Sequence, residues 1–183
     1  MIKVGMRIIA GHRKGRKIIA KHDSKTRPTT DRVRENVFNT LFGLMEINGA
    51  RVLDLFAGCG SYGLECYSRG AVEVTFNDTD KQAVEIVKHN CKVVGCDGVV
   101  LNLDYKLALE KLKTKKFDII FLDPPYESDF AEIALEIIMN QNMLSENGII
   151  VIETEKDLGV QALKIKTYGR ARLYFVNPNL QLC

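Results

Sequence analysis

Short apolar runs alternate with helical segments through most of the chain. The apolar runs show little polar alternation, which is typical of strands buried on both faces, and they lie at residues 51–56, 72–77, 99–103, 117–122 and 148–153. Between them, apolar positions recur every three or four residues and predict helices at 61–69, 80–94, 105–112 and 129–139. This repeated strand–helix–strand order predicts an α/β fold with a parallel, doubly wound sheet covered by helices on both faces.

The amino-terminal part has a different pattern. Two β-rich runs at 6–10 and 17–20 flank a basic, glycine-containing turn and predict a small hairpin. A helix is predicted to begin near Thr29–Asp31, where hydroxyl and carboxylate side chains can cap free N–H groups, and to end at Gly43 or at Asn48-Gly49.

The carboxyl-terminal part also breaks the alternation. Two runs at 162–166 and 170–176 are separated by Thr167-Tyr168-Gly169 and predict a hairpin that adds an antiparallel edge to the sheet. We therefore expect a single domain over residues 1–183, with a basic hairpin and helix at 1–45 and a catalytic core at 51–183.

Composition limits the class of protein. A chain of 183 residues with 46% hydrophobic side chains can bury a full core without disulfides or a structural metal. It has no apolar run of the roughly 18–20 residues that span a membrane, and the basic cluster at 13–17 interrupts any signal-peptide core. The five cysteines form no C-x-x-C pair and favour reduced thiols. We expect a cytoplasmic monomer without a metal site or membrane contact.

Positive charge is concentrated near the amino terminus. Residues 1–34 hold eleven Lys or Arg against two Asp, whereas the other 149 residues hold 15 Lys or Arg against 21 Asp or Glu. This asymmetry suggests a polyanionic partner, although a solvated basic surface is an open alternative. The candidate RNA contacts are Arg13, Lys14, Arg16, Arg27, Arg32 and Arg34.

A glycine-rich loop follows the first strand of the core. Gly58, Gly60 and Gly63 spell G-x-G-x-x-G, and Asp78 stands 20 residues after the first of them, at the end of the next strand. Such a loop lets the backbone approach a nucleoside cofactor, with the acid on a ribose hydroxyl, but it does not say which cofactor. Asp54, just before the loop, would interfere with a diphosphate and suits the ammonium group of S-adenosylmethionine (SAM).

The loop after the fourth core strand reads Asp123-Pro124-Pro125-Tyr126. The prolines restrict the backbone and direct its carbonyls, the aspartate supplies a carboxylate, and the tyrosine supplies an aromatic face. Together they predict a clamp for a planar ring with an exocyclic amine. A rigid loop that ends in a core tyrosine is the structural alternative. If the two loops follow neighbouring strands, we expect them to meet at one edge of the sheet.

Three further residues have open roles. Asp104, at the end of the third strand, can bind the adenine amine of SAM or cap the following helix. Glu153, at the end of the fifth strand, faces the same edge, with a structural role favoured. Cys59 lies inside the glycine loop, where we interpret it as a small spacing residue rather than a nucleophile.

The sequence resembles the RsmD-type 16S ribosomal RNA guanine-N2 methyltransferases over nearly the whole chain. The most restrictive block runs from Arg27 to Asn39, and the other matching segments are 6–11, 14–16, 54–58, 63–65, 68–71, 123–126 and 168–169. The resemblance implies a seven-stranded, Rossmann-like SAM-dependent methyltransferase fold that modifies one guanine N2 in small-subunit rRNA during ribosome assembly. Its partner would be ribosomal RNA or a small-subunit assembly particle.

The resemblance also implies roles for individual residues. Asp123, Pro124, Pro125 and Tyr126 would form the catalytic loop, and SAM would be lined by Asp54, Phe56, Gly58, Gly60, Asp78 and Asp104. Two positions depart from the family pattern, since Cys59 stands where Ser or Thr is more common and Asp78 where Glu is. The shorter reach of Asp78 leaves open whether it alone holds the ribose.

Other functions remain compatible with these motifs. Loops of the D/N-P-P-Y type also serve DNA adenine-N6 and protein-glutamine methyltransferases, although those enzymes usually have separate recognition regions. From other classes, an NAD-dependent dehydrogenase and a non-catalytic RNA-binding assembly factor are the alternatives.

Overall fold

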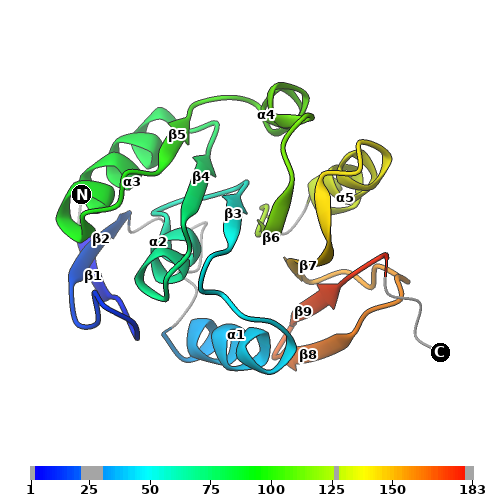
Figure 1. The fold of residues 1–183 in the computed structure, drawn as a ribbon, viewed down its shortest axis with the longest axis horizontal. Coiled ribbons are helices and arrows are strands. Elements are labelled where there is room, and N and C mark those ends of the chain that lie inside the picture. Colours follow the sequence, from blue (N-terminus) through cyan, green and yellow to red (C-terminus); the bar gives the residue numbers. More distant parts are fainter. Residues whose placement is uncertain (1–2, 22–30, 126–127, 180–183) are drawn as a thin grey trace.

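The computed structural model describes residues 3–21, 31–125 and 128–179. Its centre is a seven-stranded sheet (Figure 1) built from β3 (Arg51–Asp54), β4 (Glu73–Asn77), β5 (Val99–Leu101), β6 (Phe117–Leu122), β7 (Leu144–Thr154), β8 (Lys164–Tyr168) and β9 (Ala171–Val176). The strand order is β5-β4-β3-β6-β7-β9-β8, in which the first five strands are parallel and β9 pairs antiparallel with both its neighbours. The predicted mostly parallel sheet with an antiparallel carboxyl-terminal hairpin is confirmed.

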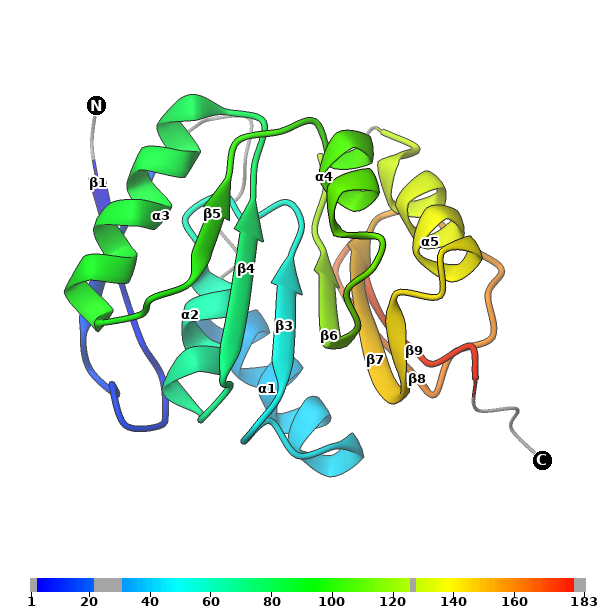
Figure 2. The ribbon, with the colours of Figure 1, turned by 45° about the horizontal axis from the view of Figure 1, so that its top comes forward.

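Helices cover both faces of the sheet (Figure 2). One face carries α1 (Asp31–Leu44), α2 (Ser61–Ser68) and α3 (Lys81–Val94), and the other carries α4 (Tyr105–Leu112) and α5 (Phe130–Asn140). Successive strand residues point to opposite cores: Val52 packs with the α1–α3 side, whereas Leu53 packs with the α4–α5 side. Burial on both faces explains why these strands show little polar alternation.

The chain reverses its direction of travel across the sheet between β3 and β6. It passes outward from β3 through β4 to β5, and then crosses back to β6 on the other side of β3. The loops after β3 and β6 therefore lead away from each other at the carboxyl edge of the sheet, which is the position where open α/β folds bind ligands. Asp54 on β3 aligns with Phe121 on β6, two residues before Asp123. The two motif loops thus follow neighbouring strands, as expected.

The amino-terminal hairpin forms a separate two-stranded sheet of β1 (Lys3–Arg7) and β2 (Lys17–Lys21). The prediction that the first strand continues to Ala10 is wrong. The backbone N–H groups of Ile9 and Ala10 donate instead to the carboxylate of Glu65 in α2, at 2.8 and 2.9 Å. Glu65 is fully buried, so this contact fastens the hairpin onto the core.

Several element boundaries differ from those predicted. β3 and β5 end early because the side chain of Asn77 takes over their backbone groups: its amide donates to the carbonyls of Leu55 and Leu103, and its oxygen accepts the Leu103 N–H. β7 begins at Leu144 rather than residue 148, since Leu144 pairs with Phe117 ahead of a register shift. Among the residues that the structure describes, no helix is both long and apolar enough to cross a bilayer.

Candidate active site

The three glycines of the loop after β3 serve different purposes. Gly58 and Gly60 have φ angles of +56° and +79°, a region that favours glycine. A Cβ on Gly63, in the first turn of α2, would lie 2.3 Å from Cε1 of Phe76, so this glycine permits α2 to pack closely on β4. A Cβ on Gly58 would meet no atom within 4 Å. The backbone at Gly58 therefore borders open space.

Asp78 connects the glycine loop to the end of β4. One carboxylate oxygen accepts the Gly58 N–H at 2.8 Å, and the other accepts the Asp80 N–H at 2.9 Å. The side chain is half-buried, and an ionised carboxylate has about four acceptor sites. Asp78 can therefore hold the loop and still accept hydrogen bonds from a diol.

Asp54 lies beneath the loop and is 2% exposed. Its carboxylate accepts the Gly63 N–H at 3.0 Å. Burial raises the pKa of Asp54 to about 7, with the Gly63 hydrogen bond opposing the shift. The structure thus shows Asp54 joining β3 to α2, and a contact between its carboxylate and a ligand ammonium stays a prediction.

Aromatic rings line the edge beside the loop. The ring of Phe56 lies 5.5 Å from that of Tyr105, which lies 5.0 Å from that of Phe130. Sequence reasoning missed the last two, although each is an aromatic residue at the first position of a helix that follows a strand end. Asp104 is exposed and caps α4 by accepting the Lys106 N–H at 2.9 Å, so its capping role is established here.

The proline loop leaves β6 beside this edge. Pro124 is buried and Pro125 is exposed, while Asp123 is half-buried at the strand end. The Pro125 carbonyl accepts hydrogen bonds from both the N–H and the hydroxyl of Ser128, at 3.1 and 2.6 Å. The Pro125 carbonyl therefore already accepts hydrogen bonds within the protein. Tyr126 lies outside the described residues.

Tyr62 and Glu153 lie close together beside Asp123. The Tyr62 hydroxyl donates to Glu153 at 3.1 Å, and the Tyr62 ring stacks on Phe121 at 4.7 Å. Glu153 is 4% exposed. The two loops and this buried carboxylate thus come together at one edge.

Comparison with known proteins identifies the family. The family described as "Conserved hypothetical protein 95" matches residues 6–177. The "Ribosomal RNA small subunit methyltransferase D" of Haemophilus influenzae is 39% identical over 156 residues, which cover 83% of this chain and 80% of that protein. The chain belongs to this family. It is the RsmD-like family that the sequence resembles.

Solved structures agree with this assignment. "Putative methyltransferase yhhF from Escherichia coli" has a TM-score of 0.82 and 30% identity, over 94% of this chain and 97% of that one. A Pyrococcus abyssi tRNA (uracil-54, C5)-methyltransferase, solved with S-adenosyl-L-homocysteine, has a TM-score of 0.67 at 17% identity, over 94% of this chain and 43% of that one. The second likeness shows the fold alone. The RsmD-like chain therefore has the Rossmann-like fold of SAM-dependent methyltransferases.

The basic residues of this RsmD-like chain do not form one patch. Arg13, Lys14 and Arg16 lie in the hairpin turn, whose backbone is held by Ser68 at the end of α2. Because α2 runs antiparallel to the strands, this turn lies at the sheet edge opposite the glycine loop (Figure 2). Arg32 is exposed at the start of α1. Arg27 lies outside the described residues.

Arg34 requires a correction. It is fully buried, and its guanidinium donates to the backbone carbonyl of Arg7 at 2.5 Å. A phosphate does not reach a side chain enclosed in this way. We therefore assign Arg34 to the contact between α1 and the hairpin rather than to an RNA-binding surface.

Proposed function

We propose that this protein transfers a methyl group from SAM to the exocyclic N2 amine of a guanine in small-subunit ribosomal RNA. The observation that carries the proposal is the alignment of Asp54 with Phe121, which puts the glycine loop and the Asp123 loop on neighbouring strand ends. Membership of the RsmD-like family supports the same substrate class, and we propose a cytoplasmic location because ribosomes are assembled there.

The residues around the glycine loop fit SAM. Open space borders Gly58, and the half-buried Asp78 carboxylate suits a ribose diol. Phe56 offers an aromatic surface next to the ring of Tyr105, which follows the exposed Asp104. When bound, SAM supplies a sulfonium-activated methyl group. It would be held and oriented at the carboxyl edge of the sheet by Gly58, Asp78, Phe56 and Asp104.

The Asp123 loop supplies what the acceptor needs. An exocyclic base amine is a poor nucleophile because its lone pair is delocalised into the ring. The Asp123 carboxylate and the Pro124 carbonyl would accept the two N–H bonds, which favours a more pyramidal nitrogen and directs its lone pair. As positive charge develops on that nitrogen, the carboxylate of Asp123 partly neutralises it.

Methyl transfer to ribosomal particles tests the proposal. Small-subunit particles from cells lacking this protein are incubated with the purified protein and tritiated SAM, and the labelled nucleotide is mapped. We expect label on the N2 of a single guanine. Label only on adenine, or only on protein, would refute the proposed target and support the related amino-methyltransferase classes.

Cofactor titration separates the other classes. Isothermal titration is expected to show binding of SAM in preference to NADH, and the reverse preference would indicate a dehydrogenase. A non-catalytic assembly factor would assist ribosome assembly equally well after Asp123→Ala, whereas we expect the methylated guanine to depend on that residue.

A further inference from the structure

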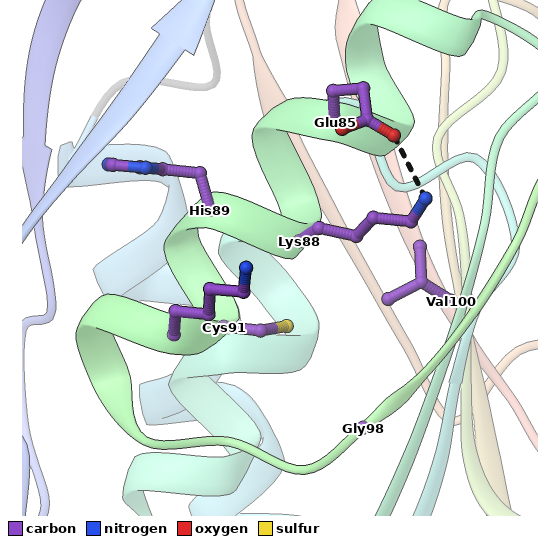
Figure 3. A pocket seen from close by; sticks show the side chains of 7 residues that line it. Glu85, Lys88, His89, Cys91, Gly98 and Val100 are labelled. Carbon is purple, nitrogen blue, oxygen red and sulfur yellow. Dashed lines mark hydrogen bonds and ion pairs between the residues drawn. The ribbon is translucent and has the colours of Figure 1, made fainter.

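Helix α3 borders a recess of about 330 Å³ on the surface beside the edge strand β5. Lys88, His89 and Lys92 line it together with Glu85. Figure 3 shows Lys88 and His89 projecting to opposite sides of the helix, with Lys88 directed toward Val100 on β5. Two of these four polar side chains are lysines and one is a glutamate, so the recess has a net positive charge and suits an anionic ligand.

A glycine shapes the far wall of this recess. A Cβ on Gly98 would lie 2.7 Å from Cε2 of Phe76 and 2.8 Å from the Val74 carbonyl oxygen. The segment leading into β5 therefore lies directly against β4 at this point.

The basic residues of α3 follow one stripe along the helix. Lys81, Glu85, Lys88 and Lys92 are spaced by four, three and four residues, and all four are exposed. The 14 residues of α3 span roughly 21 Å. The stripe thus runs from the cofactor edge of the sheet, where α3 begins just after Asp80, to the opposite edge.

The acidic member of the stripe leaves the lysines available. Glu85 pairs with Lys88 at 2.8 Å, but the two side chains are 71% and 50% exposed. An exposed pair of this kind contributes little free energy. Lys88 can therefore exchange Glu85 for a phosphate at small cost.

The hairpin turn continues the stripe beyond the end of α3. Gly95 caps the helix with φ +77°, and a Cβ there would lie 3.2 Å from Nη2 of Arg13. The guanidinium of Arg13 therefore lies about one turn past Lys92. Lys14 and Arg16 of the same turn are exposed. Asp97, also exposed, is an acidic neighbour on this surface.

The turn is fastened to the core rather than free to move as an arm. The N–H and Nδ1 of His12 both lie 2.8 Å from the Ser68 carbonyl, and the Arg13 N–H donates to the Ser68 hydroxyl at 3.0 Å. A Cβ on Gly11 would lie 1.8 Å from that carbonyl oxygen. The backbone of the turn is thus held next to the end of α2.

We propose that the α3 stripe (Lys81, Lys88, Lys92) and the hairpin turn (Arg13, Lys14, Arg16) together bind the phosphate backbone of the RNA substrate. The proposal takes the RNA partner from the proposed function and adds the surface that holds it. Cations in a row, at a fixed distance from the site, position a phosphodiester chain without reading its sequence. RNA that enters the site at the carboxyl edge would follow α3 to the turn at the opposite edge.

Salt-dependent binding tests this surface. The double variant Lys88→Gln/Lys92→Gln is compared with wild type by fluorescence anisotropy, using a fluorescein-labelled small-subunit rRNA fragment over a series of KCl concentrations. We expect weaker binding at low salt. The slope of log affinity against log salt is expected to become shallower by about 0.7–0.9 for each phosphate contact removed.

A control that removes one positive charge lies on the opposite face of the sheet. Lys113 forms an i,i+3 pair with Glu110 at 2.5 Å, with both side chains about as exposed as those of the Lys88 pair. We expect Lys113→Gln to leave the slope unchanged, and the double variant to bind SAM as wild type does, which shows that it is folded.

The outcomes separate the surface from the function. An unchanged slope and affinity in the double variant, with wild-type methyl transfer to guanine intact, would overturn this surface alone. A shallower slope in a protein that transfers no methyl group to RNA would support the surface and contradict the proposed function. If Lys113→Gln lowers RNA affinity and the salt slope equally per charge removed, the effect depends only on net charge, and the proposal is overturned.

Discussion

The side-chain amide of Asn90 in α3 donates a hydrogen bond to the backbone carbonyl of Cys59 in the glycine loop, at 2.9 Å. The same amide donates to the Ile19 carbonyl at 2.8 Å, and the Asn90 oxygen accepts the Ile19 N–H at 3.0 Å. Asn90 is fully buried. One side chain thus joins the amino-terminal hairpin to the loop that is expected to hold the cofactor.

Replacing Asn90 tests this connection. Asn90→Ala leaves half-buried backbone groups of Ile19 and Cys59 without this partner, and the cost for a fully buried group is about 1–3 kcal/mol. We expect a lower free energy of unfolding by chemical denaturation, and weaker SAM binding by calorimetry. The control is Asn177→Ala, because Asn177 is also buried and bonds to the Glu146 carbonyl away from the loop. The control should lose stability but keep its SAM affinity, and equal losses of SAM affinity would contradict the assigned link.

Alanine substitution at two helical glycines is expected to change the stability of the protein in opposite directions. Gly63→Ala forces a methyl group against Phe76, and overpacking of this kind costs about 1–3 kcal/mol. Gly43, near the end of α1, has no atom within 4 Å of a built Cβ and no positive φ. Gly43→Ala should therefore stabilise the protein by about 0.4–1 kcal/mol through the unfolded chain. Thermal and chemical unfolding measure both, and a stable Gly63→Ala protein would contradict the close packing of α2.

The pKa of Asp54 predicts a pH-dependent stability. Its pKa is raised from 3.8 to about 7 in the folded protein, so the folded state binds the proton more tightly than the unfolded state does. The stability that this group contributes is complete below about pH 4 and is lost as the pH rises through about 7. In Asp54→Asn this titration is absent. We expect the unfolding free energy of the variant, relative to wild type, to increase across this range by a few kcal/mol. A constant difference would show that Asp54 titrates normally.

Glu65 is expected to control the attachment of the hairpin. Besides the two hairpin amides, it accepts a hydrogen bond from Arg69 at 3.0 Å. In Glu65→Gln the charge that satisfies these donors is lost, so hydrogen exchange should rise over residues 6–20 more than in β4. The control is Glu110→Gln, since Glu110 is 58% exposed and its pair with Lys113 contributes little. Unchanged exchange in the hairpin of Glu65→Gln would show that its attachment does not depend on the Glu65 charge.

Loss of the Asp123 carboxylate should slow methyl transfer. A charged hydrogen-bond acceptor contributes roughly 1.5–3 kcal/mol, so Asp123→Ala should reduce turnover by about tenfold to 150-fold. The comparison uses SAM-saturated single-turnover rates on small-subunit particles, with SAM affinity measured in parallel. Wild-type turnover in the variant would remove Asp123 from the mechanism.

Local patterns in the sequence were sufficient for most of the fold. The apolar runs predicted the parallel strands, and of the two roles left open for Asp104 the structure shows the helix cap. Strand ends were predicted less well. The Asn77 side chain ends β3 and β5 through bonds to residues 22 and 26 positions away, and no local pattern indicates such a bond.

The candidate site, like the fold, was predicted from the sequence only in part. The sequence placed Asp123 and the glycine loop at one edge, because parallel strands present their carboxyl ends together. It did not indicate that the Pro125 carbonyl accepts hydrogen bonds from Ser128 or that the Asp54 side chain is buried. It also did not indicate that Tyr105 and Phe130 lie beside the loop. Those facts depend on how helices pack, which residue type alone does not specify.

By itself, the sequence determined the alternation of strands and helices, the two motif loops and the excess of positive charge near the amino terminus, because each is a local property of residue order. Only the tertiary structure decided where that charge goes: Arg34 into the core, and Arg13 to the end of α3 at the edge opposite the cofactor loop. The physical reason is that buried contacts such as Glu65 with Ile9, 56 residues apart, position the hairpin. Such contacts form only when the chain has folded.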